Sequence, residues 1–257
     1  MDAAKATITL KDGTTIQGDL ILGADGVHSV TRDIVAGRHL PTHGSGKSAF
    51  RFLIKKQAAL DDPLVAPYFQ SEGDLTIWYG IDRRLVVYPT TNNTLLNFVC
   101  IHPENESDGG ETWNKTASRE QMLKIYDDFD PAMLALIKKA DPETLKVWKL
   151  LDMETMETWV RDKLALLGDA AHPFTPHQGQ GGGQAIEDAA ALAVVLPRDT
   201  PKDEIRERLQ LYEKIRKDRA HRIQEYSRVA GRDVKEGVKE DSKYQTFLLL
   251  LLEVCVR

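Results

Sequence analysis

The spacing of hydrophobic and polar positions in residues 1–40 predicts a β-hairpin followed by a short buried strand. Segments 7–10 and 14–17 have strand-like patterns and flank Asp12-Gly13, a pair that tolerates the positive φ angles of a tight hairpin turn. Residues 20–24 are mostly apolar, as in a short buried strand. Asp25-Gly26 follows the end of this strand, and Ser29 can cap the turn after it.

The next part of the chain has the pattern of an antiparallel sheet. Residues 38–46 are rich in Gly, His, Pro and Ser, which indicates a crossing into a second domain. Short β-rich segments separated by Asp/Arg or Asn turns then follow at residues 49–54, 75–81, 85–88 and 95–101.

Helical spacing begins near residue 118. Ser118 and Gln121 form a capping box, which predicts a helix whose apolar side chains share one face. Asp130-Pro131 predicts a second helix with Pro at its first position, and residues 144–151 are a candidate strand that returns to the first domain.

Two further helices are expected near the end of the chain. Residues 184–196 are apolar nearly all round, which predicts a helix buried under the sheet. Thr200-Pro201 opens a heavily charged helix that extends to about Arg228. The apolar run at residues 247–252 is far shorter than the ~20 residues that cross a bilayer. It is either a buried strand or helix end, or part of a tail that is not native-like.

Composition narrows the class of protein. A length of 257 residues and 42% hydrophobic content suit one large or two small globular domains. The net charge of −5 and the lack of a basic block argue against nucleic-acid binding. Cys100 and Cys255 form no disulfide or metal framework, and residues 1–5 lack a signal-peptide pattern, so we expect a cytoplasmic protein without a membrane span.

The segment from residue 164 onwards carries the strongest chemical signal. An apolar strand ends at Gly168-Asp169, a Pro-rich loop follows, and glycines then open a helix. The Asp169 carboxylate can accept hydrogen bonds from vicinal hydroxyls, or it can cap the loop. Glycines allow a flat ring to approach the backbone at the positive helix end, or they form a flexible loop. These glycines are Gly179, Gly181, Gly182 and Gly183.

The Gly168-Asp169 segment and the Asp25-Gly26 segment together resemble the "GD" and "DG" fingerprints of FAD-dependent aromatic hydroxylases. These are class A flavoprotein monooxygenases, and the closest resemblance is to the salicylate-hydroxylase-like branch. The resemblance implies a mixed α/β (α+β) fold, with an incomplete Rossmann-like FAD-binding domain and an inserted antiparallel-sheet substrate domain. The boundaries expected from it are 1–40 and 148–257 for the FAD-binding domain and 41–147 for the substrate domain. No G-x-G-x-x-G follows a strand, so we expect the opening βαβ unit to be missing.

The resemblance also implies an activity. FAD would be reduced by NAD(P)H and react with O₂ to a C4a-hydroperoxide, which hydroxylates a small phenolic or aromatic-acid substrate. Two alternatives stay open. One is a flavin oxidoreductase that does not hydroxylate; the other is a non-catalytic remnant that binds FAD weakly or not at all.

Residue roles follow from the resemblance in the same way. Gly168 and Asp169 would hold the ribityl chain, and Pro176 would line the reaction cavity. The other fingerprint would organise the FAD pyrophosphate and the pyridine nucleotide, through Asp25, Gly26, His28 and Arg32. A surface ion pair beside Ser29 is the simpler reading of that second cluster.

The side-chain chemistry of three residues suggests roles that stay open. His177 suits a general base for a phenol, although a locally hydrogen-bonded loop histidine explains it equally well. Arg51 could bind a substrate carboxylate through two parallel hydrogen bonds of its guanidinium, or it could simply be an exposed arginine on a strand. His172 and His177 lack a third ligand with matching spacing, so no metal site is expected.

Overall fold

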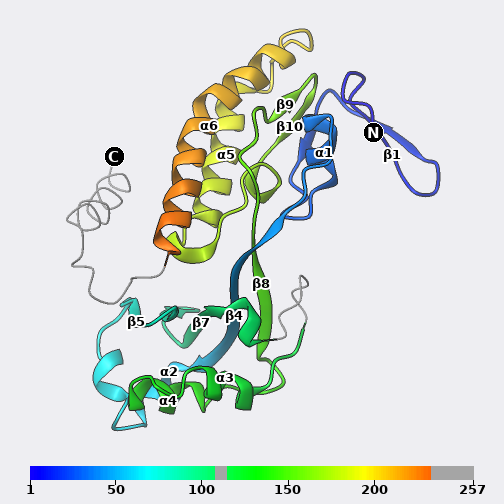
Figure 1. The fold of residues 1–257 in the computed structure, drawn as a ribbon. Helices are drawn as coiled ribbons and strands as arrows, with labels where there is room; N and C mark the ends of the chain where they lie inside the picture. The colour runs from blue at the N-terminus through cyan, green and yellow to red at the C-terminus, as the bar shows by residue number, and fades with distance from the viewer. Residues whose placement is uncertain (108–114, 233–257) are drawn as a thin grey trace.

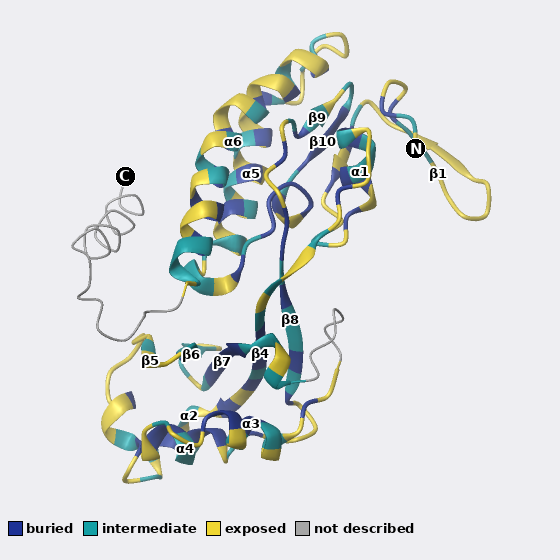
Figure 2. Ribbon diagram, in the orientation of Figure 1, coloured by how far each residue is buried: buried dark blue, intermediate teal, exposed yellow. Residues whose placement is uncertain are grey.

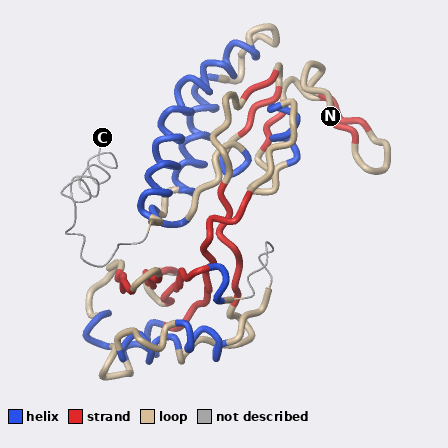
Figure 3. The backbone as a smooth tube through the Cα atoms, in the orientation of Figure 1, coloured by secondary structure: helices blue, strands red, loops and turns tan. Residues whose placement is uncertain are grey.

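The structure is a computed structural model that describes residues 1–107 and 115–232 (Figure 1). It has an α/β part that contains helices α5 (Gly181–Val195) and α6 (Ile205–Ala230), and a second part built on a five-stranded sheet. The long strands β4 (His43–Lys55) and β8 (Lys146–Asp152) run between the two parts (Figure 3). The expected class of mixed α/β fold is confirmed. The domain boundaries at residues 40 and 147 remain a proposal.

The hairpin expected around Asp12-Gly13 is present. Strands β1 (Thr7–Thr9) and β2 (Thr15–Gln17) pair antiparallel, and Gly13 has a φ of 87°. The next helix, α1 (Val30–Ala36), is capped by the Ser29 side chain, which accepts a hydrogen bond from the Arg32 amide.

Strand β3 (Ile21–Gly23) pairs parallel with β10 (Leu164–Leu166), so distant parts of the sequence meet in one sheet. The short strand β9 (Val160–Arg161) pairs antiparallel with β10 and completes the order β3-β10-β9. Because β3 and β10 are parallel, their carboxyl ends lie at the same sheet edge. The loops that begin at Ala24 and Leu167 are therefore neighbours.

The second sheet has the strand order β5-β6-β7-β4-β8, and all its pairings are antiparallel. Strands β5 (Thr76–Gly80), β6 (Arg83–Thr90) and β7 (Leu95–Pro103) match three of the segments predicted from the sequence. Helices α2 (Lys56–Leu60), α3 (Arg119–Ile125) and α4 (Pro131–Ile137) belong to this part.

The sheet buries one face against these helices and leaves much of the other open (Figure 2). Alternate residues of β4 and β7 enter the core, as the period of two in a strand requires; they are Phe50, Phe52, Ile54, Leu96, Phe98 and Cys100. Ser118 and Asp130 cap α3 and α4 as the sequence predicts, since each side chain accepts from a first-turn amide.

Helix α5 (Gly181–Val195) is less buried than the expected helix under the sheet. Ile186 is 72% exposed and Val194 79% exposed, whereas Gln184 and Asp188 are fully buried. The polar residues can face inward because α6 (Ile205–Ala230) lies alongside and supplies arginine partners for them. The described residues end at 232, so the apolar run at 247–252 lies outside them.

Candidate functional site

The turn after β10 is set by glycine. Gly168 has a φ of 60°, in the left-handed region that other residues adopt only with strain. A Cβ at this position would lie 3.3 Å from the Ala185 Cβ, so the turn approaches the first turns of α5 closely. The chain then makes a single 3-10 turn, Gly168–Ala170, and the amides of Ala171 and His172 both donate to the Gly168 carbonyl.

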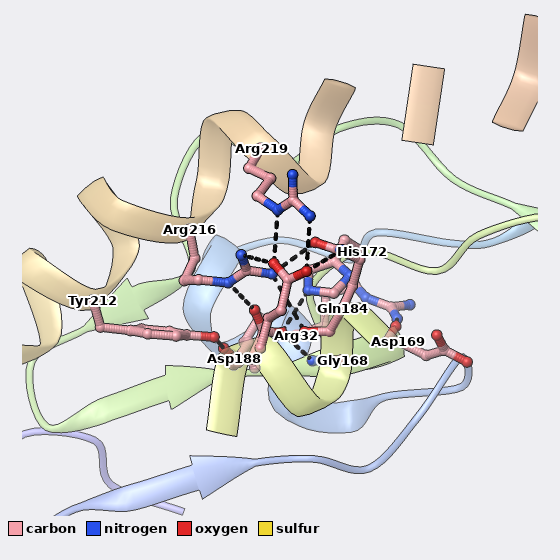
Figure 4. A network of polar contacts seen from close by, with 11 residues as sticks. Arg32, Gly168, Asp169, His172, Gln184, Asp188, Tyr212, Arg216 and Arg219 are labelled. Carbon is pink, nitrogen blue, oxygen red and sulfur yellow. Dashed lines mark hydrogen bonds and ion pairs between the residues drawn. The ribbon is translucent and has the colours of Figure 1, made fainter. Parts of the chain in front are cut away.

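The Asp169 side chain leaves this turn in the direction away from the buried network of Figure 4. The residue is exposed, and among residues 1–107 and 115–232 no donor hydrogen-bonds its carboxylate. Surrounding protein nevertheless removes much of the hydration of the carboxylate. This desolvation raises the pKa of Asp169 above its usual value, while His172 and Arg32 oppose the rise. The turn thus presents an acceptor that the described chain does not use.

Asp25 is occupied by its own chain. Its carboxylate accepts from the Ser29 hydroxyl at 2.6 Å and from the amides of Val30 at 2.8 Å and Thr31 at 3.0 Å. Desolvation would raise the pKa of Asp25, but the hydrogen bonds from Ser29 and Thr31 outweigh it and lower the pKa. The carboxylate therefore fixes the start of α1, next to Gly26 with its φ of 78°. His28 is exposed on the same loop.

Arg32 fastens the two strand-end loops together. The side chain is buried, with 1% of its surface exposed, and its four hydrogen bonds to the described chain all go to backbone carbonyls. The Nε donates to Ala170 at 2.8 Å and Nη2 to Asp169 at 2.7 Å. On its own loop, Nη1 donates to Val27 at 2.9 Å and Nη2 to Gly26 at 3.3 Å. These hydrogen bonds of Arg32 therefore join the first sequence motif to the second.

A buried polar network behind the turn was not foreseen from the sequence (Figure 4). The Asp188 carboxylate accepts from the Gly168 amide at 2.9 Å and from Arg216 Nε at 2.8 Å, and it lies 2.6 Å from His172 Nε2. The sequence signal was an acidic pair, Glu187-Asp188, on an otherwise apolar helix, with Arg216 and Arg219 one turn apart on the next helix.

The network keeps its acidic groups ionised. Desolvation alone would raise the pKa of Asp188, but hydrogen bonds from His172, Gly168 and Arg216 lower it. For Glu187, the hydrogen bond from Arg219 is the largest cause of a pKa lowered to about 2, with Arg216 adding its charge. Asp188 is thus a paired buried carboxylate that holds the backbone of the Gly168 turn.

The glycines at the start of α5 leave open space. A Cβ on Gly182 or Gly179 would meet no atom within 4 Å, and one on Gly183 or Gly181 would meet only single atoms at 3.8 Å. Gly179 also has a φ of 62°. The helix end that follows the Gly168 turn can therefore be approached by a ligand without side-chain obstruction.

The loop between the turn and α5 carries the two residues proposed for chemistry. Pro176 is exposed and opens the 3-10 turn Pro176–Gln178. His177 is half-buried and its ring lies against the end of α6, since a Cβ on Gly231 would fall 2.6 Å from the His177 Cδ2.

Arg51 lies apart from this cluster, on β4 of the five-stranded sheet. Its guanidinium sits 5.6 Å from the Trp148 ring centroid, and Nη2 reaches the Asn97 Oδ1 at 3.4 Å. In the part of the chain that the structure describes, Arg51 makes no hydrogen bond or ion pair with the Gly168 turn.

Within residues 1–107 and 115–232, no three His, Cys, Asp or Glu side chains gather closely enough to hold a metal ion. In the same ranges no helix combines the length and the apolar character needed to cross a membrane.

Comparison with known proteins places these features in a family. Residues 1–227 match the model of a family described as "FAD binding domain". The FAD-dependent monooxygenase cfoG of Aspergillus candidus is 35% identical over 255 residues, which cover 93% of this chain and 58% of that protein.

Solved structures agree. HpxO of Klebsiella pneumoniae, complexed with FAD and uric acid, has a TM-score of 0.76 at 30% identity and covers 90% of this chain and 55% of that one. A salicylate hydroxylase substrate complex has a TM-score of 0.77 at 25% identity, over 97% of this chain and 64% of that one. The chain therefore spans a little over half the length of the relatives it matches.

Proposed function

Because the chain belongs to the FAD binding domain family, whose matched relatives include FAD-dependent monooxygenases, we propose that it contributes the flavin-contacting turn of an aromatic hydroxylase. The substrates of that enzyme would be a small phenolic or aromatic acid, O₂ and NAD(P)H. A cytoplasmic location belongs to the same proposal and is supported by the lack of a paired-cysteine pattern.

One observation carries the proposal: an unused carboxylate and an unobstructed helix start flank the same glycine turn. Asp169 has no hydrogen-bond donor in the described chain, and Gly182 has open space where a side chain would lie. The Gly168 amide is bonded to Asp188 of α5, so turn and helix form one rigid unit. Such a unit suits a ligand that has both hydroxyl groups and a flat ring.

The residues present fit FAD. Asp169 would accept hydrogen bonds from ribityl hydroxyls, and Gly168 gives the turn its shape. Gly179, Gly181, Gly182 and Gly183 would let the ring system approach the helix start, whose partial positive charge stabilises negative charge by ~0.3–1 kcal/mol when exposed and up to ~2 kcal/mol when partly buried.

The loop with Asp25-Gly26 would support the flavin site by holding its neighbouring loop in position. Arg32 is a positioning residue in the proposal, because its contacts hold both loops in place rather than pointing at solvent. His28 is exposed and can meet phosphate oxygens, and Gly26 leaves its loop free of a side chain. Asp25 would act by fixing the start of α1 beside them.

Three residues would contact the substrate or take a proton from it. Arg51 would bind a carboxylate of the substrate from the open face of the sheet, with Trp148 and Asn97 orienting its guanidinium. Pro176 would line the cavity, and its ring removes a backbone donor. His177 would take the proton of a phenol, as its ordinary pKa of ~6.5 permits.

Bound FAD would supply the redox chemistry, by accepting electrons from NAD(P)H and activating O₂ for transfer of one oxygen atom to the ring. The protein would contribute orientation, water exclusion and proton transfer at His177. No residue needs to act as a nucleophile.

Product analysis tests this function. The protein is incubated with FAD, NAD(P)H, O₂ and a panel of phenolic acids, and products are identified by mass spectrometry. Hydroxylated aromatic product formed with NAD(P)H oxidation is the expected result. Hydrogen peroxide equal to the NAD(P)H consumed, with unchanged aromatic substrate, would favour the non-hydroxylating oxidoreductase. Lack of flavin binding would favour the non-catalytic alternative.

A further inference from the structure

Four buried polar atoms, at and around the His172 ring nitrogen that does not contact Asp188, have no hydrogen-bond partner in the described protein. They are Trp159 Nε1, His172 Nδ1, His221 Nε2 and Gln224 Oε1. Trp159 and His172 have no exposed surface, and Gln224 is equally enclosed. Buried polar groups in folded proteins are almost always paired with protein or with ordered water, so an accumulation of four demands a partner.

These four side chains are neighbours. The Trp159 ring centroid lies 4.8 Å from that of His172 and 5.8 Å from that of His221. The Gln224 amide nitrogen donates to the carbonyl of Pro173, the residue that follows His172, at 3.0 Å. That bond also fixes the orientation of the amide, because its oxygen must then point elsewhere. Trp159 therefore lies between the two histidine rings, and Gln224 joins the group through the residue next to His172.

Their hydrogen-bonding capacities are complementary to those of water. Asp188 is ionised and accepts from His172 Nε2, so a neutral His172 carries its proton on Nε2 and offers a lone pair on Nδ1. Trp159 Nε1 can only donate, and Gln224 Oε1 can only accept. Burial is the largest cause of a lowered pKa of His221, and the charge of Lys217 adds to it, so the ring is mainly neutral at pH 7 and Nε2 can donate.

We propose that these atoms form a binding site for one internal water molecule. The water accepts from Trp159 Nε1 and His221 Nε2 and donates to His172 Nδ1 and Gln224 Oε1. Buried waters typically make two to four such bonds, and each one satisfies protein groups that would otherwise be costly to bury.

The site links the Gly168 turn to α6. His172 follows the turn and bonds Asp188 through one ring nitrogen, while the water holds the other nitrogen. His221 and Gln224 belong to α6. Asp188 thus holds His172 Nε2 to α5, and the water would hold Nδ1 to α6. This role concerns the folded protein itself and holds whether or not a flavin binds.

A high-resolution crystal structure of the protein without ligand tests the proposal. We expect an ordered water within hydrogen-bond distance of at least three of the four atoms. Direct pairing of the four atoms with one another, or a site that stays dry, would overturn the proposal.

A spectroscopic test uses two matched variants that both alter packing against His172. W159F removes the donor to the water, and F174L shortens an apolar ring that lies 5.0 Å from the His172 ring. In nitrogen-15 spectra of the wild type, we expect His172 to be the Nε2–H tautomer with a hydrogen-bonded Nδ1. Because W159F leaves the water with one donor, His221 Nε2, the water should be held less firmly. The Nδ1 resonance should therefore move toward that of a free lone pair in W159F and stay in place in F174L. Equal shifts in both variants would show a packing effect only and would refute the water bridge.

Discussion

Arg32 Nη2 donates a hydrogen bond to the backbone carbonyl of Asp169 at 2.7 Å, across 137 positions of the sequence. The same guanidinium holds the carbonyls of Gly26 and Val27, which follow the Asp25 motif. One buried side chain thus fixes the distance between two loops that leave adjacent parallel strands. The relative position of the two sequence motifs depends on this contact.

Replacing Arg32 should therefore destabilise the fold. R32M removes the charged donor from the backbone carbonyls that Arg32 bonds. We expect a loss of ~2–5 kcal/mol in the free energy of unfolding. The control is R38M, which removes an ion pair with Glu154 in which both side chains are more than half exposed; its effect should stay within ~1 kcal/mol. Urea unfolding measures both, and equal effects would show that Arg32 has no special structural role.

Asp188 should be coupled energetically to Arg216. D188N removes a buried carboxylate that accepts three hydrogen bonds, and we expect a loss of ~3–5 kcal/mol. In a double-mutant cycle with R216M, the coupling energy should be ~0.5–3 kcal/mol, because each partner compensates the burial of the other. E204Q, at a partly exposed i,i+4 pair with Arg208, is the control and should cost at most ~0.5 kcal/mol. Additive effects at 188 and 216 would argue against the network.

Acid should destabilise the protein partly through His102. Burial lowers the pKa of His102 to about 4, from an ordinary value near 6.5. The unfolded chain then binds a proton more readily than the folded one. The contribution of His102 to the free energy of unfolding is therefore fully present above pH 6.5. It is lost as the pH drops toward 4, by on the order of 3 kcal/mol. H102Q should flatten this part of the pH profile of unfolding, whereas H28Q, at an exposed site, should not. Parallel profiles for H102Q and wild type would contradict the assignment.

Two glycines should respond to alanine in opposite ways. A Cβ at Gly80 would lie 2.5 Å from the Phe129 ring, so G80A should cost ~1–3 kcal/mol through overpacking. Gly182 is helical with open space around it, so G182A should stabilise the chain by ~0.4–1 kcal/mol. Thermal unfolding of both variants checks the signs, and a destabilised G182A would mean that the space at the helix start is not open.

Local signals in the sequence predicted local structure well. Asp12-Gly13 predicts the hairpin, Ser118 and Asp130 predict helix starts, and the period of two predicts the strands of the second sheet, since each depends on neighbouring residues. The prediction that α5 is buried under the sheet was wrong. A count of apolar residues cannot show that Asp188 would pair with Arg216, which lies 28 positions away in the sequence.

The same limit applies to the site. The motifs predicted which loops would meet, and the parallel pairing of β3 with β10 brings them together. The sequence did not predict that Arg32 would bond only carbonyls, because that outcome depends on the exact positions of four backbone groups. The ligand roles of Asp169, the α5 glycines and Arg51 stay predictions.

Nuclear magnetic resonance titration tests the central claim most directly, because it detects even weak binding. The nitrogen-15-labelled chain is titrated with riboflavin, which has the ring and ribityl chain, and then with FAD. We predict that the amides of Gly168, Asp169 and Gly181–Gly183 shift together, that D169N weakens binding at least tenfold, and that D203N, an exposed control, does not. Shifts confined to other parts of the chain, or a D169N variant that binds as well as wild type, would contradict a flavin site at this turn.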